Sequence, residues 1–317
     1  MNPNRQYRIY RHKFVTPLQS AHGIWGERVS IILREEDNKG RISFGELCPT
    51  PGFIDIPLNE LLPIVERWVL GEPFKLNSLM KSAISCMESE IWDSSFGENY
   101  SSTIFSAELI TLNSDLANPS AVYKKKIGLS TSLSEIQEVK DFLNLVPLDS
   151  MIRLDANESL SIDQIFQWNE AFANESRLQF IEQPLPRENI DELLKIEQEL
   201  SISLALDESL VWKNALSFFE EKDWQGFYVL KPFLFQDWSK MLRFIRAKPE
   251  KTIVSTIFES PFGYEAVCRC ASFSNQVAGL DRNLFQLSDQ EFSQHHQKPL
   301  SSQTISVSFL DELWGNL

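Results

Sequence analysis

The pattern of apolar and polar residues divides the chain into two parts near residue 104. In the first part, Tyr7–Ile9 and Val29–Leu33 alternate apolar and polar residues, as half-buried strands do. Two later stretches, Leu58–Val69 and Met80–Trp92, instead repeat apolar residues at helical spacing. The first hundred residues therefore predict a mixed α+β unit.

From about residue 104 onward, short apolar strands alternate with helix-length amphipathic segments. Eight strands are predicted, at Phe105–Leu109, Val122–Ile127, Met151–Ala156, Leu178–Gln183, Ser203–Glu208, Phe227–Pro232, Thr252–Ile257 and Gln276–Asp281. Polar residues near the ends of the last seven strands recur every 24 to 29 residues. Such a repeat holds one strand, one helix and two loops, and eight of these units close a barrel.

These patterns predict an α/β fold, a TIM-like (β/α) barrel with an α+β capping domain. We expect the capping domain at residues 1–103 and the catalytic barrel at residues 104–284. Apolar residues in the tail predict that residues 285–317 pack back and complete the capping domain. An open, doubly wound sheet is the main alternative, but no Gly-x-Gly-x-x-Gly motif follows any of the strands.

Composition narrows the possible partners and the compartment. The net charge of −14 would repel nucleic acid and anionic lipid, so we expect neither nucleic acid nor a membrane as a partner. The N-terminal residues lack the apolar core of a secretory signal. The four cysteines form no Cys-x-x-Cys pair, which speaks against zinc, and reduced thiols favour a cytoplasmic location.

Three carboxylates end consecutive predicted barrel strands. Asp155, Glu182 and Asp207 each follow an apolar strand, and the C-terminal ends of barrel strands converge on the active site. Carboxylates held so close repel one another unless a cation neutralises them. Hard oxygen ligands without paired His or Cys favour Mg²⁺, so we expect a magnesium cofactor here.

Three lysines flank the carboxylates. The two-residue period of a strand puts Lys124 and Lys126 on one side and Lys125 on the other, and Lys231 ends the sixth strand on the opposite wall. Lys125 stands where an apolar residue facing the helices is expected, which leaves the register of this strand open. A lysine beside a bound cation has a lowered pKa, which suits a general base near neutral pH.

The order Lys-x-Lys, Asp-x-Asn, Glu-Gln-Pro, Asp-Glu and Lys-Pro resembles the enolase superfamily, in its muconate-lactonising subgroup, over essentially the whole chain. The resemblance implies an enzyme that removes a proton next to a substrate carboxylate through a magnesium-stabilised enediolate. Lys126 would be the base and then the acid of a syn dehydration, assisted by Lys124, with Lys231 facing the other side of the substrate. The magnesium ligands would be Asp155, Glu182 and Asp207.

The resemblance also implies supporting and substrate-binding residues. Asn157 and Glu208 would support the metal site, and Ser260 with backbone N–H groups near Gly263 would receive a second substrate carboxylate. A mobile loop of the capping domain covers the barrel mouth in this superfamily. The corresponding segment is residues 20–28, whose two glycines suit such motion and whose Arg28 could meet an anionic substrate.

Within the subgroup, the short length, the compact N-terminal unit and the sequence Ser255–Ser260 look most like dehydratases of menaquinone biosynthesis. These act on 2-succinyl-6-hydroxy-2,4-cyclohexadiene-1-carboxylate. Isomerases share the same lysines and carboxylates, so an N-acylamino acid racemase, a dipeptide epimerase or a muconate cycloisomerase is the alternative. The eighth strand ends in one acid followed by a cation, Asp281-Arg282, which favours an all-anionic small-molecule carboxylate over a substrate with an α-ammonium group.

A barrel that keeps these ligands only as a scaffold is a third possibility. Retention of both Lys126 and Lys231 argues against it. The residues point to no particular oligomeric state.

Overall fold

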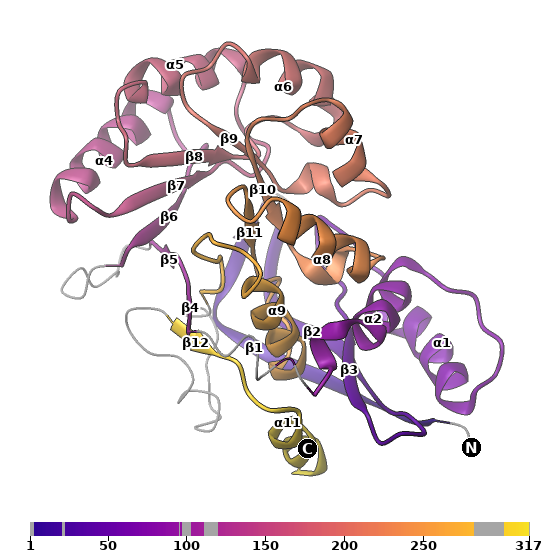
Figure 1. The fold of residues 1–317 in the computed structure, drawn as a ribbon. Helices are drawn as coiled ribbons and strands as arrows, with labels where there is room; N and C mark the ends of the chain where they lie inside the picture. The colour runs from indigo at the N-terminus through magenta and orange to yellow at the C-terminus, as the bar shows by residue number, and fades with distance from the viewer. Residues whose placement is uncertain are drawn as a thin grey trace.

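The computed structural model describes residues 3–20, 23–94, 96, 103–110, 120–281 and 301–316 of the chain. They form a three-stranded antiparallel sheet, a seven-stranded parallel sheet and a two-stranded pair, β12–β4, with helices packed around them (Figure 1). In the described ranges, no helix combines the length and the apolarity needed to cross a membrane.

The antiparallel sheet belongs to the N-terminal part. Its strands are β1 (Asn4–Ser20), β2 (Gly23–Glu36) and β3 (Ile42–Leu47), in that order across the sheet. The turn after β2 is held by Asp37, whose Oδ1 accepts the N–H groups of Lys39 and Arg41 at 2.7 and 2.9 Å. Helices α1 (Leu58–Leu70) and α2 (Ser78–Glu88) pack their apolar faces against this sheet, as their spacing predicts.

The parallel sheet is the barrel. Its strands are β5 (Glu108–Leu109), β6 (Val122–Lys126), β7 (Met151–Asp155), β8 (Leu178–Glu182), β9 (Leu204–Leu206), β10 (Phe227–Leu230) and β11 (Thr252–Val254). They pair side by side in chain order, each parallel to the next. The helices between and after them are α4 (Ser132–Leu145), α5 (Ile162–Phe172), α6 (Ile190–Glu197), α7 (Ala215–Glu221), α8 (Trp238–Ala247) and α9 (Pro261–Ala271). They lie along the outer side of the curved sheet (Figure 1), so the prediction of a TIM-like barrel is confirmed.

The described residues also include four short 3-10 turns. They are η1 (Glu90–Trp92), η2 (Arg187–Asn189), η3 (Glu208–Leu210) and η4 (Pro232–Leu234). The last two follow barrel strands directly, so they belong to the loops at the C-terminal ends of β9 and β10.

The first and eighth predicted strands are less regular than expected. The first divides into β4 (Thr103–Phe105), which pairs antiparallel with β12 (Ser301–Gln303), and the short β5. The eighth is reduced to two parallel bridges, Ala278 to Ser106 and Gly279 to Ser255, which connect the two edges of the sheet. A Cβ at Gly279 would lie 2.8 Å from the Ser255 hydroxyl oxygen, so a larger residue there would require the Ser255 side chain to shift.

The last helix, α11 (Val307–Asn316), packs on the N-terminal sheet. Asp311 on this helix accepts a hydrogen bond from the Arg34 Nε at 2.6 Å, and the Trp314 Nε1 donates to the Gln6 side chain at 2.7 Å. The tail also touches the barrel, because Arg269 of α9 donates to the Ile305 carbonyl at 2.6 Å. The domain limits at residues 103/104 and 284/285 stay predictions.

Arg269 fastens α9 to two distant segments. It forms an ion pair with Glu265 at 2.7 Å in which both side chains are 4% exposed, and it donates to the carbonyls of Ile91 and Ile305. We expect Arg269→Met to lower the free energy of unfolding by about 3–5 kcal/mol, because it leaves the Glu265 carboxylate buried without its partner. Chemical denaturation measures the change.

The control for this prediction removes both charges at once. The double variant Glu265→Leu/Arg269→Met buries no unpaired charge, so it should lose less stability than the single variant. An Arg269→Met protein that unfolds at the wild-type denaturant concentration would contradict the assignment.

Candidate active site

Three buried carboxylates lie side by side at the C-terminal ends of consecutive strands. Asp155 ends β7, Glu182 ends β8, and Asp207 follows β9 directly. Asp155 and Glu182 are paired in register, and the three residues are only 1 to 4% exposed. Apolar side chains fill the interior of the barrel below them, namely Phe180, Ala205, Val229 and Ile253. The carboxylates therefore occupy the end of the barrel where the sequence predicts the active site.

Each of the three lysines predicted from the sequence reaches this place. The Lys124 Nζ lies 2.9 Å from Asp155 Oδ2 and 2.8 Å from Glu182 Oε1. The Lys231 Nζ forms an ion pair with Asp207 Oδ2. The Lys126 Nζ donates to the Asn157 Oδ1 at 3.0 Å. Lys126 lies on β6 and Lys231 follows β10, so the three acidic strand ends lie between them in the sheet order.

The neighbouring Lys125 faces the other way. Its Nζ forms an ion pair with Glu138 on α4 at 3.1 Å. A charged residue is tolerated on the outer face of β6 because an acid on the covering helix meets it. The register left open by the sequence is thereby fixed, with Lys124 and Lys126 on the inner face.

Asn157 links the lysine to the supporting acid. Its side chain accepts from Lys126 and donates to the Glu208 Oε1 at 3.3 Å, while its backbone N–H donates to the Asp155 Oδ1 at 3.2 Å. The residue has a left-handed backbone, with φ of 42°, which asparagine tolerates better than most residues. Asn157 and Glu208 are thus part of the same hydrogen-bonded group as the metal-site candidates.

Gln183 braces this group, although the sequence analysis assigned it no role. Its side chain is fully buried, and its Oε1 accepts the N–H groups of Asp207 and Ser209, both at 3.1 Å. Its Nε2 donates to the Leu185 carbonyl at 2.9 Å and to the Ser209 hydroxyl at 2.8 Å. The sequence signals this residue by its place in the Glu-Gln-Pro motif, directly after Glu182 at the strand end.

Burial and crowding set the ionisation of the acids. Burial, together with the charge of Asp155, raises the pKa of Glu182 to about 8, and burial raises the pKa of Asp207 to about 6 despite its ion pair with Lys231. Burial also disfavours the charged form of Asp155, but the charges of Lys124 and Lys126 outweigh it and lower the pKa of Asp155. Burial and crowding therefore disfavour the charged forms of Glu182 and Asp207, and a bound cation would stabilise those forms.

The neighbouring carboxylates stabilise the charged forms of Lys124 and Lys231. Burial alone would lower the pKa of Lys124 and of Lys231, but the neighbouring carboxylates, Asp155 for Lys124 and Asp207 for Lys231, raise both. The lowered lysine pKa expected beside a bound cation stays a prediction for the magnesium-loaded site.

The donor set fits magnesium chemically, because three clustered carboxylates offer only oxygen ligands. In the part of the chain that the structure describes, no three acidic side chains are already spaced as a metal cage. The reason is that Lys124 bridges Asp155 and Glu182, while Lys231 contacts Asp207. Ligation would therefore require these ammonium groups to move off the carboxylates.

Comparison with known families and proteins agrees with this geometry. Residues 121–220 match the family described as enolase C-terminal domain-like. Similar curated proteins are o-succinylbenzoate synthases from Thermosynechococcus vestitus, 26% identical over 83% of this chain and 86% of the relative, and from Enterobacter sp., 29% identical over 80% and 82%.

Solved structures share the fold of nearly the whole chain. The o-succinylbenzoate synthase of Thermosynechococcus elongatus, complexed with magnesium in its active site, superposes with a TM-score of 0.77 at 21% identity and covers 99% of this chain and 100% of that one. The L-Ala-D/L-Glu epimerase of Bacillus subtilis gives a TM-score of 0.72 at 16% identity, with coverage of 89% and 90%. The comparisons confirm the predicted resemblance to the enolase superfamily and the prediction of an enzyme.

Ser260 and Gly263 lie beside the carboxylate of Glu46. Ser260 is fully buried at the start of α9, and its Oγ and N–H donate to the carboxylate of Glu46 on β3, at 2.6 Å from Oγ and at 3.0 and 3.1 Å from the N–H. A Cβ at Gly263 would lie 2.2 Å from the Glu46 Oε2. In this structure the anion at the start of α9 is therefore Glu46, and the substrate-binding role expected for Ser260 and Gly263 stays a prediction.

Glu46 joins the capping sheet to the barrel. Besides Ser260, it accepts the Ser30 hydroxyl of β2 at 2.5 Å. We expect Glu46→Ala to lower the free energy of unfolding by about 2–4 kcal/mol, because three buried donors lose their acceptor. Thermal or chemical unfolding measures the loss. Glu46→Gln keeps the volume and one acceptor oxygen, so it should be milder; equal stability of the alanine variant and the wild type would contradict the role.

Arg28 lies in the capping domain beside the barrel loop after β11. It is fully buried, its Nη1 donates to the Pro49 carbonyl at 2.5 Å, and its guanidinium lies over the Trp25 ring at 5.3 Å. Trp25 also packs edge-on against Phe14 and Phe258, with ring centroids 5.1 and 6.0 Å away. The Nε and Nη2 atoms of Arg28 have no hydrogen-bond partner among the described residues. The expected covering loop is described only in part, since residues 21 and 22 lie outside the described ranges.

Proposed function

We propose that this chain is an o-succinylbenzoate synthase. It would dehydrate 2-succinyl-6-hydroxy-2,4-cyclohexadiene-1-carboxylate to o-succinylbenzoate, with Mg²⁺, in menaquinone biosynthesis. The observation that carries the proposal is the convergence of three buried strand-end carboxylates with one lysine on either side of them. Support for this reaction comes from curated relatives of that name, which align with about four fifths of the chain.

Lys126 is the residue best suited to move the proton. Lys124 and Lys231 are held in ion pairs with the proposed metal ligands, whereas the Lys126 Nζ bonds to a neutral amide oxygen of Asn157. In the proposed reaction, the Lys126 amine takes the proton from the ring carbon that carries the carboxylate. The C–O bond to the ring hydroxyl then breaks, and the same ammonium returns the proton to that oxygen, so water leaves and the ring becomes aromatic.

The other charged groups hold the substrate and the developing charge. Asp155, Glu182 and Asp207 would hold magnesium, whose positive charge would stabilise the negative charge that develops on the substrate carboxylate as the proton leaves. Lys124 supports the same carboxylates, and the Lys231 ammonium would face the substrate from the opposite wall. Phe53 of the capping part lies over the Lys231 Nζ, 4.3 Å from its ring centroid, and so helps to exclude water there.

A spectrophotometric assay tests the proposal. The purified chain, supplied with the cyclohexadiene carboxylate and Mg²⁺, should release water and build the aromatic product. Excess chelator should stop the reaction, and added Mg²⁺ should restore it. Absence of product at saturating substrate and metal would contradict the proposed function.

The second candidate is an isomerase of the same superfamily. It is favoured by the fold shared with dipeptide epimerases and by the lysines on two sides of the site, which could each exchange an α-proton. Against it, the acid of the eighth strand is already engaged, because Asp281 Oδ2 accepts the Leu109 N–H at 2.8 Å. An isomerase would wash the α-proton of both stereoisomers into heavy water, whereas the dehydratase would form the aromatic chromophore.

The proposal includes a cytoplasmic location. The four cysteines, Cys48, Cys86, Cys268 and Cys270, are buried free thiols, which fits a reducing compartment.

A further inference from the structure

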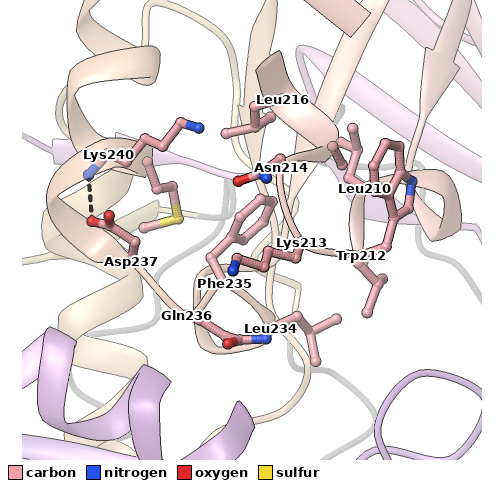
Figure 2. Close-up of a pocket in the computed structure, with 13 residues that line it drawn as sticks. Leu210, Trp212, Lys213, Asn214, Leu216, Leu234, Phe235, Gln236, Asp237 and Lys240 are labelled. Atoms are coloured by element: carbon pink, nitrogen blue, oxygen red, sulfur yellow. Dashed lines mark hydrogen bonds between the residues drawn. The ribbon is translucent and has the colours of Figure 1, made fainter. Parts of the chain in front are cut away.

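A cavity of about 160 Å³ lies beside two of the loops that carry the candidate active site (Figure 2). One wall comes from the segment between η3 and α7, and the other from the segment between η4 and α8. None of the residues around this cavity is one of the acids or lysines of the candidate active site. It is therefore a separate site, outside the barrel interior.

The walls of the cavity are tied to the catalytic loops. Leu210 and Leu234 line it, and their backbone N–H groups donate to the carbonyls of Asp207 and Lys231, each at 2.9 Å. Each wall therefore begins three residues after a proposed catalytic or metal-binding residue. A molecule bound between these walls would touch the segments that hold the ion pair between Asp207 and Lys231.

The cavity combines an apolar lining with free positive charge. Leu210, Leu234 and Phe235 supply apolar lining, and Lys213 and Lys240 supply ammonium groups. Neither lysine forms an ion pair with any acid in the described ranges. The one acid of the lining, Asp237, caps α8 by accepting the Lys240 backbone N–H at 2.8 Å.

This excess of positive charge stands out on a chain whose net charge is −14. The side chains of Lys213, Asn214 and Phe235 reach the same region of the cavity, so cationic, amide and aromatic groups are close together (Figure 2). At its edge, Trp212 is 42% exposed and offers a second aromatic surface.

We propose that this cavity binds a small monocyclic aromatic carboxylate. An apolar cavity of about 150 Å³ is large enough to hold a benzene ring, so a cavity of about 160 Å³ has room for one ring. The ring would pack on the leucines and on Phe235, and the carboxylate would meet the ammonium groups of Lys213 and Lys240. The proposal concerns binding alone and holds whichever reaction the barrel performs.

Benzoate is the probe that tests this site. It is titrated into the magnesium-loaded full-length protein and followed by ligand-observed nuclear magnetic resonance and calorimetry. The variant Lys213→Gln/Lys240→Gln should bind benzoate about tenfold more weakly, because charge-assisted hydrogen bonds are lost. Uncharged benzyl alcohol should bind wild type about as weakly as benzoate binds this variant, since it offers no carboxylate.

Further variants separate this cavity from other sites. Leu216→Trp places a ring inside the cavity and should abolish binding, and Lys195→Gln, an exposed lysine on α6, should leave it unchanged. Circular dichroism checks the fold of Leu216→Trp. If that variant does not fold, the Lys213→Gln/Lys240→Gln variant still tests the proposal. Two results would overturn the proposal. One is that Lys213→Gln/Lys240→Gln binds benzoate as tightly as the wild type, which would place benzoate in the barrel. The other is that the wild type does not bind benzoate.

Discussion

Replacing Lys126 with alanine is expected to lower kcat by about 10⁴-fold, the upper range for a positioned acid–base group. The lysine is proposed to act twice, first as base and then as acid, so no step of the dehydration proceeds normally without it. Magnesium affinity should stay close to that of the wild type, because Lys126 bonds to Asn157 and forms no ion pair with a described acid. Kinetics of the dehydration and calorimetric magnesium titration measure the two quantities.

The neighbouring lysine provides a matched control. Lys125 lies on the same strand but faces α4, where it pairs with Glu138. Lys125→Ala should therefore leave kcat within about twofold of wild type, because the lost surface ion pair contributes only about 0–1 kcal/mol to stability. An alanine variant at position 126 that keeps a tenth or more of the wild-type kcat would refute its role as the base.

Glu182→Gln is expected to weaken magnesium binding by about 100-fold and to abolish turnover at ordinary metal concentrations. The amide keeps the shape of the side chain but removes the charge that both the metal and the Lys124 ammonium would use. Excess Mg²⁺ should restore part of the activity, because the variant loses affinity and not the proton-transferring lysine. Calorimetry and activity as a function of magnesium concentration measure these effects.

An exposed acid serves as the control for this variant. Glu188 lies in η2 and is not one of the acids or lysines of the candidate active site. Glu188→Gln should therefore not change the magnesium affinity. A Glu182→Gln protein with wild-type affinity would show that this carboxylate is not a ligand.

The candidate site was largely predictable because its geometry follows from local patterns. In a parallel barrel, an apolar strand that ends in a polar residue carries that residue to the C-terminal rim. Lys126, Asp155 and Glu182 each fulfil this condition, and the in-register pairs of β6 with β7 and of β7 with β8 then bring them side by side. The two-residue period of β6 likewise predicted which lysines face inward.

Contacts between distant segments were not predictable in the same way. Glu46 and Ser260 are 214 residues apart, and the chain pattern at Ser260 is equally compatible with a substrate anion at the start of α9. Their pairing depends on how the capping sheet packs on the barrel. The bracing role of Gln183 was not predictable from the Glu-Gln-Pro motif, because it depends on bonds to Asp207 and Ser209 in the next barrel unit. The eighth strand is shorter than its apolar sequence, because only Ala278 and Gly279 bridge to neighbouring strands.

The most direct test of the central claim is a crystal structure of the protein grown with Mg²⁺. The account predicts one ion with an oxygen of Asp155, Glu182 and Asp207 each at about 2.1 Å, the distance usual for this metal. The Lys126 and Lys231 side chains should then stand on opposite sides of it. An ion bound away from these acids, or the two ammonium groups directed away from it, would contradict the account.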